Sequence, residues 1–168
     1  MGYTTEFKGF LTITPTMKPE HVAYINQFSE TRRMRRNEFL TAERPDPIRE
    51  AVELPVGEDG CYFVGEEGFA GQDHGKDVVE YNNPPRSQPG LWCKWVITEG
   101  GTKLEWSGME KFYNYIEWLE YLIDNFMNLW GYKLNGKMTW VGEDRNDRGK
   151  IIVSDNEIKT KYGHVVYR

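Results

Sequence analysis

The sequence has few of the residues that metal, redox and disulfide chemistry require. Its 168 residues include two cysteines and three histidines. Cys61 and Cys93 are each isolated, so no CxxC pair is available for a redox motif or a zinc ribbon. His21, His74 and His164 show none of the spacings of a metal site. We therefore expect no metal, no cofactor and two reduced thiols, with a single disulfide left open.

Long apolar runs and nucleotide-binding motifs are also missing. No stretch approaches the roughly 18 apolar residues that span a bilayer. The first residues lack the basic and apolar regions of a signal peptide. We therefore expect a cytoplasmic protein that does not bind membranes. The chain has neither GxxxxGK[ST] nor GxSxG, and Gly65, Gly68 and Gly71 do not fit GxGxxG.

The chain has fewer positively than negatively charged residues, whereas aromatic residues are abundant. The 21 Lys and Arg against 26 Asp and Glu give a net charge of −5, and aromatics make up 14% of the chain. A mildly acidic protein repels the phosphate backbone unless its cations are clustered, so we predict no generic nucleic-acid binding. The rings serve either a core or a recognition surface.

Length and periodicity predict a single α+β domain over residues 1–168. Residues 3–14 alternate as a strand, 91–98 and 102–106 form a hairpin, and the chain after 136 has the pattern of a meander. Strands grouped as hairpins favour an antiparallel sheet. We expect this sheet to pack against one long and one shorter helix.

Two helices are predicted from their apolar spacing and end signals. Pro19 suits the first turn of the shorter helix, which is expected to run into the arginines at 32–36. The longer helix covers about 111–130, with a capping box from Ser107 to Glu110 and a C-terminal Gly131. Its apolar positions follow helical spacing: Phe112, Tyr115, Ile116, Leu119, Leu122, Ile123, Phe126, Met127 and Trp130.

The connecting segments carry further predictions. Residues 61–64 read as a short strand, and Asn135-Gly136 reads as a turn. A long polar loop is expected at about 66–90, with a short strand near 78–81. Asp73-His74 in this loop suits either acid–base chemistry or a solvated surface. The charged segment 143–148 is interpreted as a salt-bridged hairpin tip rather than a metal site.

Two groups of residues are candidates for an anionic ligand. Arg32, Arg33, Arg35 and Arg36 concentrate positive charge, and guanidinium groups bind phosphates and carboxylates; the alternative is a solvated helix end. Three tryptophans lie on one predicted hairpin, where they stack on a base or sugar or form a second small core. The candidate ligand-binding residues are Arg32, Arg33, Arg36, Trp92, Trp95 and Trp106.

Several motifs together resemble a family of uncharacterised proteins of bacteria and their phages. They are Thr31-Arg32-Arg33-Met34, Gly68-Phe69-Ala70-Gly71-Gln72, Gln88-Pro89-Gly90-Leu91-Trp92-Cys93-Lys94-Trp95, Glu105-Trp106-Ser107-Gly108, Glu110-Lys111-Phe112-Tyr113, Trp130-Gly131-Tyr132-Lys133-Leu134-Asn135-Gly136 and Trp140-Val141-Gly142-Glu143-Asp144. The resemblance covers most of the chain and implies no catalytic residues.

Three functions remain open. The first is a non-enzymatic protein that binds a small anionic ligand, such as a nucleotide-like signal, and in a phage could act as a sponge for host immune signals. The second is a protein–protein interaction module or inhibitor, which uses the same aromatics as anchors. The third is a small hydrolase that uses dispersed carboxylates or His74. Self-association also stays open.

Overall fold

The chain folds into two compact units. The structure, a computed structural model, describes residues 2–65 and 75–164. Unit 1 comprises Met1–Met17, Lys94–Phe112 and Leu119–Arg168, and unit 2 comprises Lys18–Cys93 and Tyr113–Trp118. The chain contains both helices and strands, and the strands pair antiparallel, so the α+β prediction is confirmed. Each unit is described by itself below.

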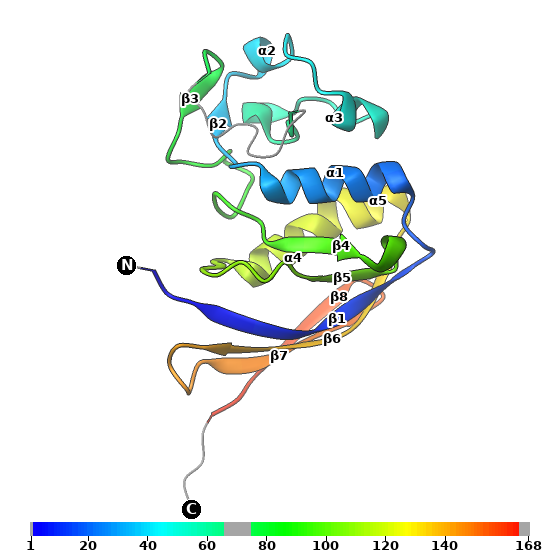
Figure 1. The fold of residues 1–168 in the computed structure, drawn as a ribbon, viewed down its shortest axis with the longest axis vertical. Coiled ribbons are helices and arrows are strands. Elements are labelled where there is room, and N and C mark those ends of the chain that lie inside the picture. The colour runs from blue at the N-terminus through cyan, green and yellow to red at the C-terminus, as the bar shows by residue number, and fades with distance from the viewer. Residues whose placement is uncertain (1, 66–74, 165–168) are drawn as a thin grey trace, which may run out of the picture. The chain divides into compact units, whose positions relative to one another are not determined.

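Unit 1 contains a six-stranded antiparallel sheet, of which β1, β6 and β7 run side by side in Figure 1. The strand order is β4-β5-β1-β6-β7-β8. Their bounds are β1 Thr5–Thr14, β4 Trp95–Thr98, β5 Lys103–Trp106, β6 Lys133–Gly142, β7 Arg148–Ser154 and β8 Glu157–Tyr162. β4 and β5 form the predicted hairpin around Glu99–Gly101, and β6 to β8 form the predicted meander. β1 joins the two groups because it pairs with both β5 and β6.

The sheet has one apolar and one charged side. Successive side chains of a strand point to opposite faces, and residues in register share a face. The side that we call the inner face carries buried residues such as Leu11, Leu104, Met138 and Ile151. The opposite side, the outer face, carries every charged residue of the six strands.

The core of unit 1 combines the inner face with helical residues. α4 (Tyr115–Leu122) continues as a π-helical turn (Ile123–Met127) and ends in α5 (Asn128–Trp130). The predicted apolar residues are fully or nearly fully buried at Leu119, Leu122, Ile123, Phe126 and Met127. Gly131 ends the helix in the left-handed conformation, as predicted.

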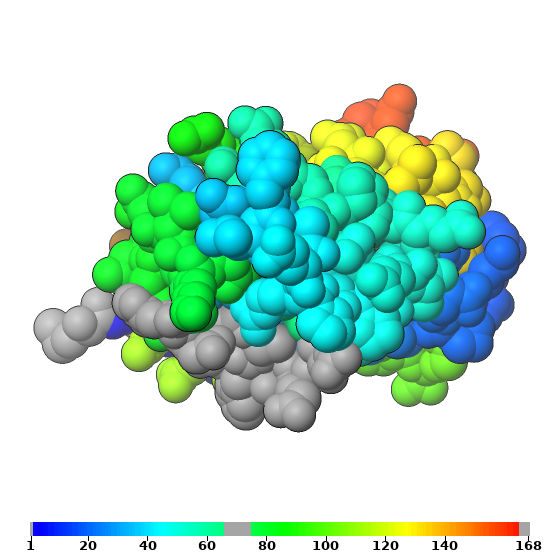
Figure 2. All heavy atoms as spheres, turned by 90° about the horizontal axis from the view of Figure 1, so that it is seen from above, coloured from blue at the N-terminus to red at the C-terminus, as the bar shows by residue number. Residues whose placement is uncertain are grey.

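Unit 2 is built on α1 (Pro19–Glu30), which buries Tyr24, Ile25 and Phe28. Two short strands, β2 (Arg35–Arg36) and β3 (Val78–Glu80), pair antiparallel. α2 (Glu38–Thr41) and α3 (Pro47–Ala51) follow β2. In Figure 2 the cyan segment of α2 and α3 forms much of the surface seen, beside the green segment that holds β3. The strand predicted near 78–81 is therefore confirmed.

Two predictions in unit 2 are wrong. The first helix does not reach the arginines: it ends at Glu30, because Thr31 turns to an extended conformation and its hydroxyl donates to the carbonyl of Gln27. Arg36 then lies on a strand, so it does not share a helix face with Arg32. The segment 61–64 forms turns rather than a strand, because the side chain of Arg33 takes the place of a neighbouring strand as partner for its carbonyls.

Two predictions in unit 1 are also wrong. Ser107 caps no helix, since Gly108, Lys111 and Asn114 adopt positive φ angles and the helix begins at Tyr115. Asn135-Gly136 lies inside β6 rather than at a turn. Gly136 is needed there because a side chain would come within 2.9 Å of the carbonyl oxygen of Phe10 on β1.

Candidate functional site

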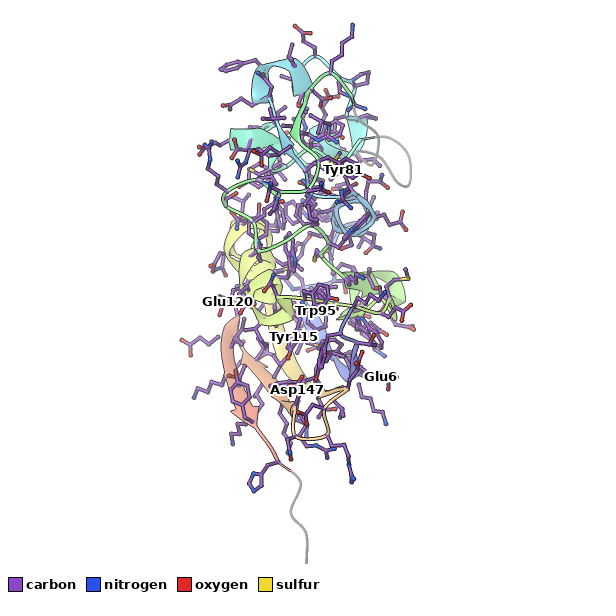
Figure 3. All side chains as sticks on the ribbon, turned by 90° about the vertical axis from the view of Figure 1, so that its left-hand side faces the viewer. Glu6, Tyr81, Trp95, Tyr115, Glu120 and Asp147 are labelled. Atoms are coloured by element: carbon purple, nitrogen blue, oxygen red, sulfur yellow. The ribbon has the colours of Figure 1, made fainter. Side chains whose placement is uncertain are left out.

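The predicted arginines are engaged inside unit 2. Arg32 stacks on the ring of Tyr81, with 4.1 Å between guanidinium carbon and ring centroid, and its Nε donates to the Tyr81 carbonyl over 3.0 Å (Figure 3 labels Tyr81). Arg33 is 2% exposed and donates to the carbonyls of Cys61 and Phe63 over 2.8 Å each. The Arg33 contacts hold the segment around 61–64 in place, and both guanidinium groups have partners within unit 2.

Arg36 belongs to a buried charge cluster around Asp77. Its Nη1 lies 2.6 Å from Asp77 Oδ2, the hydroxyl of Thr41 donates to the same oxygen, and Arg44 lies 3.2 Å from the other oxygen. Burial would raise the pKa of Asp77, but the hydrogen bond from Thr41 and the two cations outweigh it and lower the pKa. Arg36 is 3% exposed. Its ion pair with Asp77 joins β2 to the segment before β3.

The three tryptophans are divided between the units. Trp92 is half-buried in unit 2. Trp95 and Trp106 pair directly across β4 and β5 on the inner face of unit 1, where Trp95 is fully buried (Figure 3). The ring of Phe7 lies 5.2 Å from Trp95 and 5.5 Å from Trp106. Trp95 and Trp106 thus contribute to an aromatic core. The sequence had left open either such a core or a surface that stacks on a base or sugar.

The other sequence candidates are the charged segments and the two cysteines. Asp73 and His74 lie outside the described residues. At the tip between β6 and β7, Asp147 accepts hydrogen bonds from the Tyr3 hydroxyl and the Trp140 indole rather than forming the predicted salt bridge. Within residues 2–65 and 75–164, no group of three His, Cys, Asp or Glu side chains could hold a metal ion. Cys61 and Cys93 are both buried and are not joined by a disulfide.

The outer face of the sheet gathers unpaired positive charge. It carries eight cations and three carboxylates, a formal charge of +5, in a chain whose total is −5. The remaining residues therefore carry −10. In the described part of the chain none of the eight cations forms an ion pair. The cations are Lys8, Lys103, Lys133, Lys137, Arg148, Lys150, Lys159 and Lys161; the carboxylates are Glu6, Glu105 and Glu157.

The strand register arranges these cations in rows across the sheet. One row runs Lys8, Thr139, Lys150 and Lys161, from β1 to β8. The next row runs Phe10, Lys137, Ile152 and Lys159. Lys150 and Lys161 lie directly opposite each other, an arrangement in which like charges repel and destabilise a sheet. The stability of the sheet therefore does not explain why two lysines lie opposite each other here.

A hollow of about 420 Å³ adjoins these rows at one end of the sheet. Its lining includes Arg148, Lys150 and Lys161, together with the exposed Tyr162. The Tyr162 ring stands edge-on to Trp140, with 5.4 Å between centroids. Because Tyr162 pairs with Gly149 and contacts Trp140, its ring lies on the inner side of the sheet, whereas the three cations belong to the outer face.

Protection of a sheet edge explains only part of this charge. Edge strands commonly carry lysines that block pairing with another chain, and β8 is an edge strand. Lys8, Lys137 and Lys150, however, lie on the internal strands β1, β6 and β7. The opposite edge strand, β4, has no charged residue. The cations therefore follow the face rather than the edge.

Sequence reasoning missed this face although part of the signal was present. Cations alternate with uncharged residues at 148–151 and 158–161, and the same period places Lys8 and Lys137 on one side of their strands. The missing information was the register, which aligns lysines that are more than a hundred residues apart.

Comparisons with known proteins add no assignment. The chain matches no protein-family model, no curated protein and no solved structure. In the part of the chain that the structure describes, no helix has the length and apolar character needed to cross a membrane. The function is therefore argued from the chemistry of the outer face.

Proposed function

We propose that this protein is a non-enzymatic binding protein whose ligand carries phosphate groups and lies on the outer face of the sheet. The proposal keeps the ligand class expected from the sequence and moves the site away from Arg32, Arg33 and Arg36, whose guanidinium groups have internal partners. The observation that carries it is the group of eight cations on one face of an acidic protein, none of which forms an ion pair with another described residue.

Charge clustering changes the argument about polyanions. The expectation of no nucleic-acid binding depended on cations that are not clustered. At physiological salt, charges separated by more than a Debye length of about 8 Å are largely screened. A phosphate on the outer face therefore interacts mainly with the lysines around it, and the acidic residues elsewhere contribute little. Opposed lysines such as Lys150 and Lys161 gain stability when an anion lies between them.

Calorimetric titration with inorganic polyphosphate at low salt tests the proposal. We expect binding by the native protein and a loss of at least tenfold in affinity for Lys150→Glu and for Lys161→Glu. Lys76→Glu is the matched control, since Lys76 is an exposed lysine of unit 2 and lies on no strand of the sheet. Equal losses in all three variants, or no binding by the native protein, would refute a site on this face.

An interaction module remains the second candidate because of exposed apolar residues in unit 2. Phe39 is 77% exposed and Leu40 44% on α2, and Val79 is 59% exposed on β3. Exposed large side chains of this kind anchor protein interfaces. Sedimentation equilibrium tests self-association through them: a native dimer that Phe39→Ser converts to a monomer would support this function. A monomer at all concentrations would exclude self-association.

A further inference from the structure

We infer that the ligand of the outer face is a single-stranded nucleic acid, whose phosphates lie along the lysine rows and one of whose bases stacks on Phe10. This inference rests on the proposed function and names the class of its ligand. It starts from the size of the charged area. The row from Lys8 to Lys161 crosses three strand spacings, roughly 14 Å.

The dimensions of the face favour an extended polyanion over a small molecule. Small ligands bind in concave sites that bury most of their surface. The outer face instead spreads its cations over β1, β5, β6, β7 and β8. A single phosphate group reaches one or two of them, whereas successive phosphates of a strand reach a whole row. The spread of charge therefore matches a chain of phosphates.

An exposed ring within the rows distinguishes single strands from duplexes. Phe10 is 39% exposed in the centre of the sheet, in register with Lys137. The ammonium group of Lys103 lies 4.1 Å from the Phe10 ring centroid, so positive charge accompanies the ring. Bases stack on such rings only when they are unpaired, because a duplex keeps its bases inside its own stack.

Tyr162 offers no second stacking position, because it belongs to the other side of the sheet. It pairs with Gly149 and stands edge-on to Trp140, and both of these residues lie on the inner face. The Tyr162 ring is 77% exposed, but it shares its side with none of the lysine rows. It therefore serves as a reference ring of unit 1 that a strand on the outer face does not contact.

Fluorescence anisotropy with labelled oligonucleotides of roughly 15 nucleotides, the upper range for one single-strand-binding domain, tests the inference. The probes are oligo-dT, oligo-rU and a DNA duplex of the same length, with inorganic polyphosphate of equal charge as competitor. We expect both single strands to bind more tightly than the duplex and the polyphosphate. The ratio of the oligo-dT and oligo-rU affinities identifies which nucleic acid is preferred.

Aromatic variants separate stacking from charge. Phe10→Ala should weaken binding of the single strand about tenfold and leave binding of polyphosphate unchanged, whereas Tyr162→Ala should change neither, because its ring lies on the opposite side of the sheet. Phe39→Ala is the matched control, since Phe39 is an exposed ring on α2 in unit 2. Circular dichroism establishes that each variant keeps the native fold.

The outcomes distinguish this inference from the proposed function. If polyphosphate binds as tightly as the oligonucleotides and Phe10→Ala has no effect, the face recognises charge alone and the inference is overturned. Preference for the duplex overturns it as well. If neither polyphosphate nor any oligonucleotide binds, the proposed function itself is wrong.

Discussion

At the scale of single residues, Lys161 lowers the stability of the fold and, in the proposed function, contributes to ligand binding. Its Cα pairs with that of Lys150 across β7 and β8, where like charges repel. Lys161→Glu replaces this repulsion by attraction, so we predict a rise in the free energy of unfolding of about 0.5 kcal/mol. The measurement is urea denaturation at low salt. A variant that is more stable and yet binds polyphosphate less tightly separates the role in binding from any role in the fold, whereas a less stable variant contradicts the prediction.

Gly149 allows the Trp140 ring to pack against β7. A side chain at this position would come within 2.3 Å of a Trp140 ring carbon and 2.4 Å of the Lys161 carbonyl oxygen. We predict that Gly149→Ala lowers the free energy of unfolding by about 2 kcal/mol, because the overlap forces the ring or the strand to move. Gly108→Ala is the control: its side chain would meet no atom within 4 Å, so only the positive φ is strained, which costs about 1 kcal/mol. Equal losses would contradict the prediction.

Asp77 is the residue that neutralises the buried Arg36. Removing one partner of a buried ion pair costs about 3–5 kcal/mol, so we expect a loss of this size for Asp77→Asn. Glu58→Gln is the control, because Glu58 and its partner Arg86 are 77% and 67% exposed and such pairs contribute little. Denaturant unfolding of both variants at neutral pH provides the comparison.

The same carboxylate predicts a dependence of stability on pH. The pKa of Asp77 in the folded protein lies below its ordinary value of 3.8. Its contribution to stability is therefore complete above 3.8 and is lost as the pH falls through the folded-state value. Below pH 3.8 the native protein should lose stability more steeply than Asp77→Asn. Parallel curves in that range would show that this cluster does not titrate as described.

At the scale of elements, side-chain caps are formed at some helices and not at others. Oδ1 of Asn37 accepts hydrogen bonds from the backbone N–H groups of Phe39 and Leu40 at the start of α2. Ser107 accepts one from Met109 in a turn that leads to no helix. We predict a loss of about 1 kcal/mol for Asn37→Ala and less than about 0.5 kcal/mol for Ser107→Ala. Thermal denaturation of the two variants measures these losses. A larger loss for Ser107→Ala than for Asn37→Ala would contradict the structure of both segments.

The sequence predicted elements better than it predicted their partners. Alternation identified the strands of the hairpin and the meander, since one side of each strand is buried. The Asn135-Gly136 pair predicted a turn because Asn-Gly usually reverses the chain. The local sequence does not show that β1 pairs with β6 at this point. The strand expected at 61–64 failed for a related reason: its carbonyls bond to the side chain of Arg33, which is distant in sequence.

The candidate site was less predictable than the fold. Adjacent arginines at 32–36 concentrate charge in the sequence, but burial turns Arg33 and Arg36 to internal partners. Lysines that are scattered over residues 8–161 form no motif, and the register of the strands collects them on one face. Charge density along a chain is therefore a poor guide to charge density on a sheet.

At the scale of the whole molecule, opposite charges are segregated: the outer face carries +5 and the other residues carry −10. Binding of a single strand through about five phosphate contacts should therefore depend steeply on salt, with a slope of log K against log salt of about −3.5. This corresponds to a loss of about a hundredfold in affinity between about 50 and 200 mM salt. Anisotropy titrations at four salt concentrations measure the slope.

Charge variants connect this slope to the face itself. Each contact that is removed should make the slope shallower by about 0.7, so Lys150→Glu and Lys137→Glu should each reduce it by at least that amount. Lys76→Glu should leave it unchanged, since the acidic remainder of the chain is screened from a bound phosphate beyond a Debye length. A slope near zero in the native protein would mean that any observed binding depends on stacking alone. A slope that all three variants reduce equally would assign it to the net charge of the molecule rather than to the outer face.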